Sequence, residues 1–222
     1  MEFLSVFDVL GPKMIGPSSS HTAGAVSIGK MARKMFPEPV RRVRFTLYGS
    51  FAQTSRGHGT DKALLGGILG FDTYDMRIRD AFRIAGEQEI EYEYLVDTEE
   101  VMEHPNTVEI QLWGISGREM SVRGESTGGG RIRITRINGI RVEFTGEYST
   151  LIVRQFDKPG VVAHITRSLA DQNVNIAFMR LFRENKGELA YTVVESDEKI
   201  PREVLKEIEQ NPFVEETLLI QL

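Results

Sequence analysis

The order of secondary-structure patterns after Tyr148 limits the possible folds of this chain more than any other feature of its sequence. An apolar segment at residues 151–153 precedes a helical pattern that ends near Asn173, and strands are expected over residues 174–182 and 189–194. A second helical pattern and a final strand complete the series. This order, strand–helix–strand–strand–helix–strand, is typical of a ferredoxin-like domain, in which two helices cover one face of a four-stranded antiparallel sheet.

The preceding part of the chain has its own series of helical and strand-like patterns. Residues 40–49 alternate between apolar and polar side chains, which predicts a strand with one buried face. Asn138-Gly139 is a strong signal for a two-residue hairpin turn. These patterns predict a separate domain over residues 1–147. Its other expected elements are helices at 3–10 and 22–36, a short helix or a turn at 50–56, and strands at 90–96, 108–112 and 132–137.

Composition and charge exclude several classes of protein. The 222 residues carry a net charge of −5, which argues against a general nucleic-acid-binding protein. No apolar run is long enough to span a bilayer, and the first residues do not resemble a signal peptide, so we expect a cytoplasmic protein. The sequence has no cysteine, and therefore no disulfide, Cys-ligated zinc site or iron–sulfur site can be built from this chain alone.

Hydroxyl and imidazole groups are concentrated at residues 16–24, in the run Gly-Pro-Ser-Ser-Ser-His-Thr-Ala-Gly. Pro17 cannot continue a helix, and the serines at 18–20 are residues preferred as N-caps, so a turn that opens a helix is expected here. The free N–H groups of a helix N-terminus favour an anion such as a carboxylate. A position near that terminus also favours the neutral imidazole of His21, the form that a general base needs. The alternative is that the run serves only as a helix cap.

A second loop of similar design lies at residues 57–61. Gly57 and Gly59 flank His58 and let the backbone approach a ligand closely. Thr60 and Asp61 look like caps for a following helix. Two such loops form a plausible pair of walls for a small polar substrate; the alternative is a tight turn with an exposed histidine.

The C-terminal domain resembles the ACT family, whose members bind amino acids, often between two copies. The resemblance rests on Phe-Asp-Lys-Pro-Gly-Val at residues 156–161 and Asn-Val-Asn-Ile at residues 173–176. It implies a dimer formed through this domain and an amino-acid effector. The implied effector-binding residues are Asp157, Gly160, Val161, Asn173 and Asn175.

The two histidine loops resemble the signatures of the iron–sulfur-dependent L-serine dehydratases, and the whole chain resembles the beta subunit of the two-subunit bacterial form. The matching residues are 16–22 and 57–63. The resemblance implies an α+β protein with an allosteric-substrate-binding-like α/β domain over 1–147 and an ACT domain over 148–222. It also implies an alpha-chain partner whose cysteines hold a [4Fe–4S] cluster, which agrees with the absence of cysteine here.

The reaction implied by this resemblance is the beta-elimination of water from L-serine, which gives pyruvate and ammonia. The cluster iron would act as a Lewis acid on the serine hydroxyl. His21 would be the base that removes the alpha proton, and His58 a second acid–base group or a contact to the substrate carboxylate. The implied substrate-binding or supporting residues are Ser19, Ser20, Thr22, Thr60 and Asp61.

A different function is also compatible with this domain order. The layout resembles the regulatory tail of some D-3-phosphoglycerate dehydrogenases, which would make the chain a non-catalytic amino-acid sensor. The pair of histidine loops separates the two hypotheses, because a sensor needs no imidazole in both loops, whereas an elimination needs a titratable base.

Overall fold

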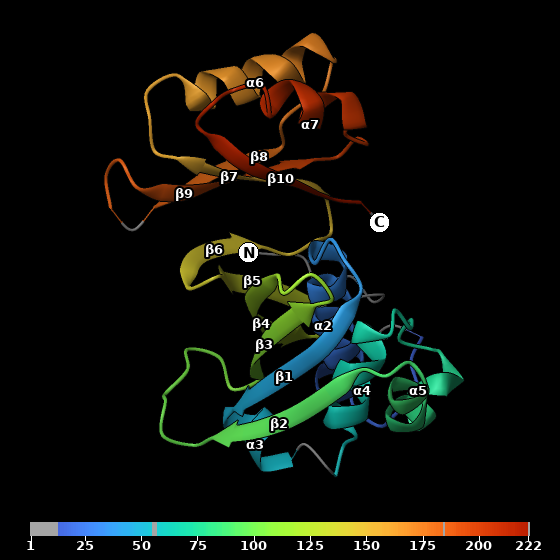
Figure 1. Ribbon diagram of the computed structural model, residues 1–222. Coiled ribbons are helices and arrows are strands. Elements are labelled where there is room, and N and C mark those ends of the chain that lie inside the picture. The colour runs from blue at the N-terminus through green and yellow to red at the C-terminus, as the bar shows by residue number, and fades with distance from the viewer. Residues whose placement is uncertain (1–12, 55–56, 184, 222) are drawn as a thin grey trace, which may run out of the picture. The chain divides into compact units, whose positions relative to one another are not determined.

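The computed structural model describes residues 13–54, 57–183 and 185–221 and divides the chain into two compact units, Met1–Asn138 and Gly139–Leu222 (Figure 1). The sequence placed the boundary nine residues later, so the difference concerns β6 (Ile140–Phe144) and the residues that follow it. Asn138 and Gly139 have φ values of 49° and 82°, the positive angles that a two-residue type I′ turn requires. The helix expected at 3–10 lies outside the described residues.

The first unit contains a mixed sheet whose strands lie in the order β2-β1-β3-β4-β5. β1 and β2 are parallel, and the other neighbouring pairs are antiparallel. The alternation predicted for β1 is confirmed, because Val43, Phe45 and Leu47 are buried while the intervening side chains are partly exposed. The strands are β1 (Val40–Tyr48), β2 (Glu91–Asp97), β3 (Thr107–Gly114), β4 (Glu119–Gly128) and β5 (Arg131–Ile137).

Helices of the first unit pack on one another and on the sheet (Figure 1). The two longest, α2 and α4, approach so closely that a Cβ atom at Gly29 would lie 2.3 Å from the Leu64 carbonyl oxygen, and one at Gly67 would lie 2.3 Å from the Val26 carbonyl oxygen. This contact holds the segments that precede the two helices near each other. The helical elements are η1 (Ser19–Ala23), α2 (Gly24–Met35), α3 (Gly49–Thr54), α4 (Thr60–Ile68), η2 (Met76–Asp80) and α5 (Ala81–Glu87).

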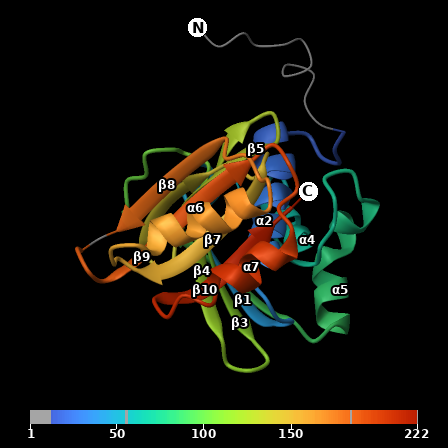
Figure 2. The same ribbon diagram turned by 90° about the horizontal axis from the view of Figure 1, so that it is seen from above.

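The second unit contains the predicted ferredoxin-like arrangement. Its four-stranded sheet has the order β10-β7-β9-β8 and is antiparallel throughout. Figure 2 shows α6 and α7 side by side over this sheet, and their apolar residues form one core with β7 and β9. The elements are β7 (Ser149–Phe156), α6 (Val161–Asp171), β8 (Phe178–Arg183), β9 (Leu189–Ser196), α7 (Arg202–Ile208) and β10 (Val214–Ile220).

The strand expected from residue 174 begins four residues later, at Phe178. The reason is the C-terminal cap of α6, where Asn173 adopts φ 55°. The N–H of Val174 donates to the Leu169 carbonyl, and the N–H of Asn173 donates to the Ala170 carbonyl. These two bonds form a Schellman motif, which uses the residues that the sequence pattern assigned to the strand.

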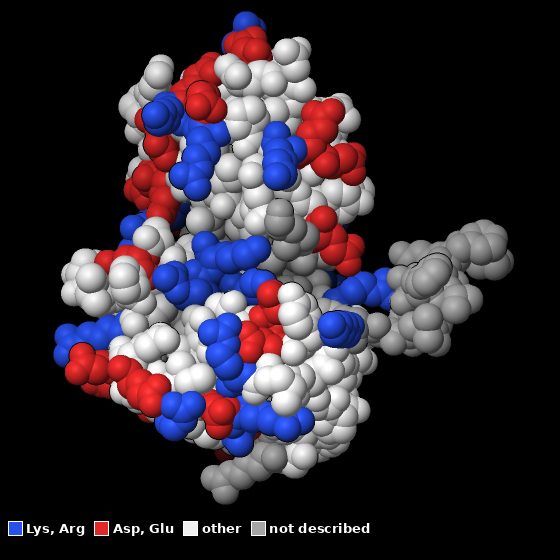
Figure 3. Space-filling view, turned by 90° about the vertical axis from the view of Figure 1, so that its right-hand side faces the viewer, with Lys and Arg blue, Asp and Glu red and all other residues white. Residues whose placement is uncertain are grey.

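The surface of both units carries charges of both signs. On the face drawn in Figure 3, Asp and Glu side chains lie among the Lys and Arg side chains. Within the described residues, no helix has the length and hydrophobicity needed to cross a membrane.

Candidate functional site

The turn before α2 is a π-helical turn, η1, whose N-cap is Ser18. The Ser18 backbone is extended, and its Oγ accepts a hydrogen bond of 3.1 Å from the N–H of His21. The N-cap role predicted for this group of serines is therefore confirmed at Ser18. A Cβ at Gly24 would lie 1.9 Å from Ser126 Oγ, so the turn lies directly against β4. Single π-helical turns of this kind are frequent at functional sites.

Hydroxyl groups contact both ring nitrogens of His21. Nδ1 lies 3.1 Å from Ser20 Oγ and 3.3 Å from Ser18 Oγ, and Nε2 lies 2.9 Å from Ser50 Oγ. The Phe51 ring packs edge-on against the imidazole, with centroids 5.4 Å apart. These contacts fix the orientation of the ring while leaving its protonation state free to change, because a hydroxyl both donates and accepts.

Ser50 and Phe51 are site residues that the sequence analysis did not identify. Both belong to α3, which follows β1 directly and resolves the choice left open for residues 50–56 in favour of a short helix at Gly49–Thr54. The N–H of Ser50 donates to the Pro105 carbonyl at 2.7 Å. Gly49 has φ 51°, and a Cβ there would lie 2.5 Å from the same oxygen, so glycine is required. The sequence signal that could have identified Ser50 is the Gly-Ser pair that directly follows the strand.

The second predicted loop lies beside the first. The His58 and His21 ring centroids are 5.0 Å apart, and Thr22 Oγ1 donates to the His58 carbonyl at 3.2 Å. His58 Nδ1 is buried without a hydrogen-bond partner among the described residues. The structure thus brings together the two imidazoles that the sequence placed in separate loops.

The residues expected to cap α4 do not cap it. The N-cap is Gly59, in the left-handed region at φ 67°, and no side chain accepts a hydrogen bond there. Thr60 is fully buried, and its Oγ1 has no partner in the described part of the chain. In the described contacts, Asp61 Oδ1 accepts a local bond from the N–H of Lys62. A glycine in this conformation replaces a capping side chain, and it leaves the Thr60 hydroxyl available.

The other hydroxyl residues predicted in the first loop make contacts within the protein. Ser19 closes the π-helical turn, since its carbonyl accepts from the N–H of Gly24. Thr22 is buried, and its hydroxyl joins the two loops. Of the three hydroxyl residues predicted to assist His21, only Ser20 has a hydroxyl hydrogen-bonded to its ring.

The electrostatic environment favours neutral His21. Partial burial lowers the pKa of its imidazole, and the neighbouring His58 lowers it further. Both effects disfavour the charged form. At neutral pH this imidazole is therefore a competent proton acceptor.

The predicted effector-binding residues lie at the two ends of α6. Asp157, Gly160 and Val161 precede or begin the helix, whereas Asn173 and Asn175 follow it, and 11 helical residues span about 16 Å. The Asp157 carboxylate already accepts bonds from Arg183 Nη1 at 2.6 Å and from the Gly187 N–H at 3.2 Å. The N–H of Asn175 donates to Glu198. In one copy, these residues therefore form two separate groups, one at each end of α6.

The donor groups of this chain do not fit a resident iron–sulfur cluster. Such clusters are held mainly by cysteine thiolates, and the sequence contains none. Within the described ranges, no group of three or more His, Asp or Glu side chains is arranged to hold a metal ion.

Comparison with known proteins identifies the family. Residues 5–136 match the serine dehydratase beta chain family, and residues 149–213 match the ACT domain. The chain is 42% identical over 214 residues to a probable L-serine dehydratase beta chain of Bacillus subtilis, covering 96% of each. It is 40% identical over 196 residues to the L-serine dehydratase beta chain of Peptoniphilus asaccharolyticus, covering 88% of each.

A more distant relative matches the alternative hypothesis. The chain is 26% identical over 206 residues to D-3-phosphoglycerate dehydrogenase of Bacillus subtilis, covering 89% of this chain but 37% of the relative. The two beta chains match at higher identity and over nearly their full length. The resemblances to the serine dehydratase beta chain and to the ACT domain are therefore confirmed. The chain belongs to the serine dehydratase beta chain family, with an ACT domain at its C-terminal end.

Proposed function

We propose that this chain supplies the proton-transfer groups of an L-serine ammonia-lyase. The reaction removes the Cα proton of L-serine, forms the Cα–Cβ double bond and breaks the Cβ–O bond, so that water leaves. The aminoacrylate product then hydrolyses to pyruvate and ammonia. The observation that carries the proposal is the His21 imidazole, which is contacted at both nitrogens by hydroxyls and lies 5.0 Å from the His58 ring.

His21 is assigned as the base because its pKa is lowered by burial and by His58. A general base works best when it is unprotonated at the operating pH. In the neutral ring, one of the Ser20 and Ser50 hydroxyls donates to the unprotonated nitrogen and the other accepts from the N–H; both accept from the imidazolium, so they support His21 before and after proton transfer.

The substrate carboxylate is placed beside the second loop. His58 Nδ1 and Thr60 Oγ1 are both buried and lack partners within the described residues. Buried polar groups are normally paired, so an unpaired set next to a helix N-terminus suits an anionic ligand. In this arrangement His58 holds the carboxylate or returns a proton during the elimination.

The partner and the cofactor complete the proposal. The [4Fe–4S] cluster is assigned to an alpha chain, because this chain has no thiolate ligand. When bound there, the cluster supplies Lewis-acid activation of the leaving hydroxyl. The ACT domain is assigned to dimer formation and to binding of an amino-acid effector, with the two groups of residues at the ends of α6 contributed by different copies.

The test is anaerobic co-expression of this chain with its alpha partner and measurement of pyruvate formed from L-serine. His21→Ala is expected to lower kcat by about 10²–10⁴-fold, the usual contribution of a general base. His164→Ala is a matched control, since His164 lies on α6 and contacts only the Glu207 carbonyl in the described contacts of its ring. Cluster content by absorbance and complex size by gel filtration must equal those of the wild type. A His21→Ala enzyme with near wild-type kcat would favour the sensor hypothesis.

A further inference from the structure

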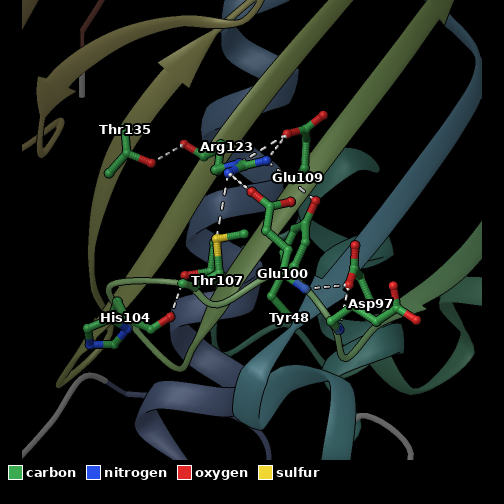
Figure 4. A network of polar contacts seen from close by, with 10 residues as sticks. Tyr48, Asp97, Glu100, His104, Thr107, Glu109, Arg123 and Thr135 are labelled. Atoms are coloured by element: carbon green, nitrogen blue, oxygen red, sulfur yellow. Dashed lines mark hydrogen bonds and ion pairs between the residues drawn. The ribbon is translucent and has the colours of Figure 1, made fainter.

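Arg123 lies at the centre of a polar network on the sheet of the first unit. Its Nε and Nη2 donate to Glu109 Oε2 at 3.0 and 2.8 Å, and its Nη1 donates to Glu100 Oε1 at 3.0 Å. Nη1 also lies 3.6 Å from the Met102 sulfur. Figure 4 shows Glu109, from β3, and Glu100, from the β2–β3 loop, turned toward the guanidinium. Arg123, on β4, therefore ties residues 98–106 to the sheet, and its side chain is only 14% exposed.

The same loop contacts the candidate site at its other end. The Pro105 carbonyl accepts the N–H of Ser50 at 2.7 Å, and Ser50 Oγ lies 2.9 Å from His21 Nε2. Glycine at residue 49 lets the two segments approach this closely. A displacement of the loop would thus move the hydroxyl that contacts the proposed base.

A second path from Arg123 reaches the same serine. Nη2 lies 3.5 Å from the Tyr48 hydroxyl, and the guanidinium carbon is 5.2 Å from the centroid of the Tyr48 ring. Tyr48 is buried and ends β1, two residues before Ser50. The guanidinium therefore contacts both segments that set the position of Ser50.

Charge explains why an arginine is needed at this position. Asp97, Glu99, Glu100 and Glu103 lie on or beside the loop, and Glu109 follows it on β3. Arg123 separates Glu100 from Glu109 and neutralises charge between them. With an apolar residue in its place, the two carboxylates would repel each other across a partly buried position, and the loop would separate from the sheet.

We propose that Arg123 is a positioning residue: by holding the β2–β3 loop on the sheet, it fixes Ser50 and, through Ser50, the orientation of the His21 ring. The link to catalysis rests on the function proposed for His21, whereas the positioning of Ser50 does not.

Amide hydrogen exchange of the full chain, measured by NMR, tests the positioning directly. In Arg123→Met, the Ser50 amide is expected to exchange at least about tenfold faster, because its bond to Pro105 opens locally. The Ile28 amide in α2 reports on the core and should keep its wild-type rate. Arg133→Met is the matched control, since Arg133 forms an ion pair of 2.7 Å with Glu125 on the same sheet and does not contact the loop in the described ion pairs. Faster Ser50 exchange in the control to the same extent, or unchanged exchange in Arg123→Met, would overturn the proposal.

Two further variants test the same ion pairs without removing the Arg123 charge. Glu100→Gln removes the loop carboxylate that pairs with Arg123 and leaves the Arg123–Glu109 pair in place, so a smaller acceleration at Ser50 is expected even if Arg123→Met does not fold. Arg123→Lys retains the charge and should restore part of the protection. An Arg123→Lys variant with the same exchange as Arg123→Met, combined with wild-type exchange in Glu100→Gln, contradicts the role assigned to the ion pairs.

The complex with the alpha chain tests the consequence for catalysis. Arg123→Met is expected to lower kcat about 10–100-fold with little change in KM, since displaced catalytic groups slow the chemical step. If His21→Ala retains activity, the proposed function of His21 fails, while the Ser50 exchange result still decides whether Arg123 positions this residue. If His21→Ala is inactive and Arg123→Met has wild-type kcat, the catalytic part of the inference is wrong.

Discussion

Two helices in different units of this protein begin with a glycine in the same backbone region. They differ in whether the polar side chains beside that glycine have hydrogen-bond partners. Gly59 before α4 and Gly160 before α6 both adopt left-handed backbone conformations, with φ of 67° and 90°, and neither helix has a side-chain cap. Beside α4, His58 Nδ1 and Thr60 Oγ1 are buried without partners among the described residues. Beside α6, the Asp157 carboxylate is bonded to Arg183 and to the Gly187 N–H.

The difference supports the proposal that the loop before α4 binds a ligand. Leaving a buried polar atom unpaired costs about 1–3 kcal/mol, so such atoms persist mainly where something else pairs with them. The loop before α4 has this property, and the loop before α6 has satisfied its carboxylate within its own unit. Local backbone geometry alone does not distinguish them.

The largest expected effect is that of His58→Ala on catalysis. The variant should lower kcat of the complex by about 10²–10⁴-fold if His58 takes part in proton transfer. Its urea midpoint should change little, because the imidazole Nδ1 has no hydrogen bond to lose among the described residues and the ring loses mainly its packing against His21. A large loss of stability with unchanged kcat would mean that His58 is a structural residue.

The two glycines allow a matched test of the comparison. Gly59→Ala and Gly160→Ala should each lower the free energy of unfolding by about 1–2 kcal/mol, the usual cost of a left-handed L-residue. A Cβ meets nothing within 4 Å at either position, so strain is the main effect. Only Gly59 adjoins the imidazole pair, and Gly59→Ala should therefore lower kcat more than Gly160→Ala. Equal losses of kcat would remove the functional distinction between the loops.

A third test concerns the loop before α6, in which the Asp157 carboxylate has hydrogen-bond partners. Asp157→Asn should lower the thermal midpoint of the second unit, because the Arg183 guanidinium loses its carboxylate partner. Arg183→Met should have a similar effect, and the double variant should be less destabilised than the sum of the two. Additive effects would show that the pair does not stabilise this loop.

The smallest expected effect is a difference in pH dependence. The pKa of His21 is lowered from its ordinary value of 6.5, so the unfolded chain binds this proton at higher pH than the folded chain. Stability should therefore fall as the pH drops through 6.5 toward the lower folded-state pKa, and His21→Gln should remove this component.

Asp157 is negatively charged when it ionises, and it affects stability over a lower pH range than His21 does. Its hydrogen bonds to Arg183 and Gly187 lower its pKa from the ordinary 3.8. Stability from these contacts is present above that value and is lost as the pH falls through the lowered pKa. Urea midpoints measured from about pH 2 to about pH 8, at steps of about one unit, should separate the two windows. A single transition that is unchanged in His21→Gln would contradict the assignment for His21.

Much of the fold was predictable because burial alternates regularly along its strands. The pattern of Val43, Phe45 and Leu47 predicted β1, and the order of elements predicted the ferredoxin-like unit. The start of β8 was not predictable from hydrophobicity, because Val174 is apolar whether it enters a strand or closes the cap of α6.

The candidate site was predictable only where several chemically distinctive residues occur together in one loop. The serine-rich run and the glycines around His58 indicated two loops, and the structure places their imidazoles 5.0 Å apart. Ser50 was missed because a single serine after a strand has no distinctive pattern around it, and the packing of α3 brings its hydroxyl to the His21 ring. The predicted caps of α4 were wrong because a left-handed glycine performed that role.

The glycine contact between α2 and α4 limits how this protein can be redesigned. Any side chain larger than hydrogen at Gly29 or Gly67 would enter the backbone of the opposite helix. The distance between these two helices is therefore fixed by contact of their backbones. Under the function proposed above, substrate preference should change through side chains beside the imidazole pair, such as Ser20 of η1 and Ser50 of α3, while the spacing of α2 and α4 stays constant.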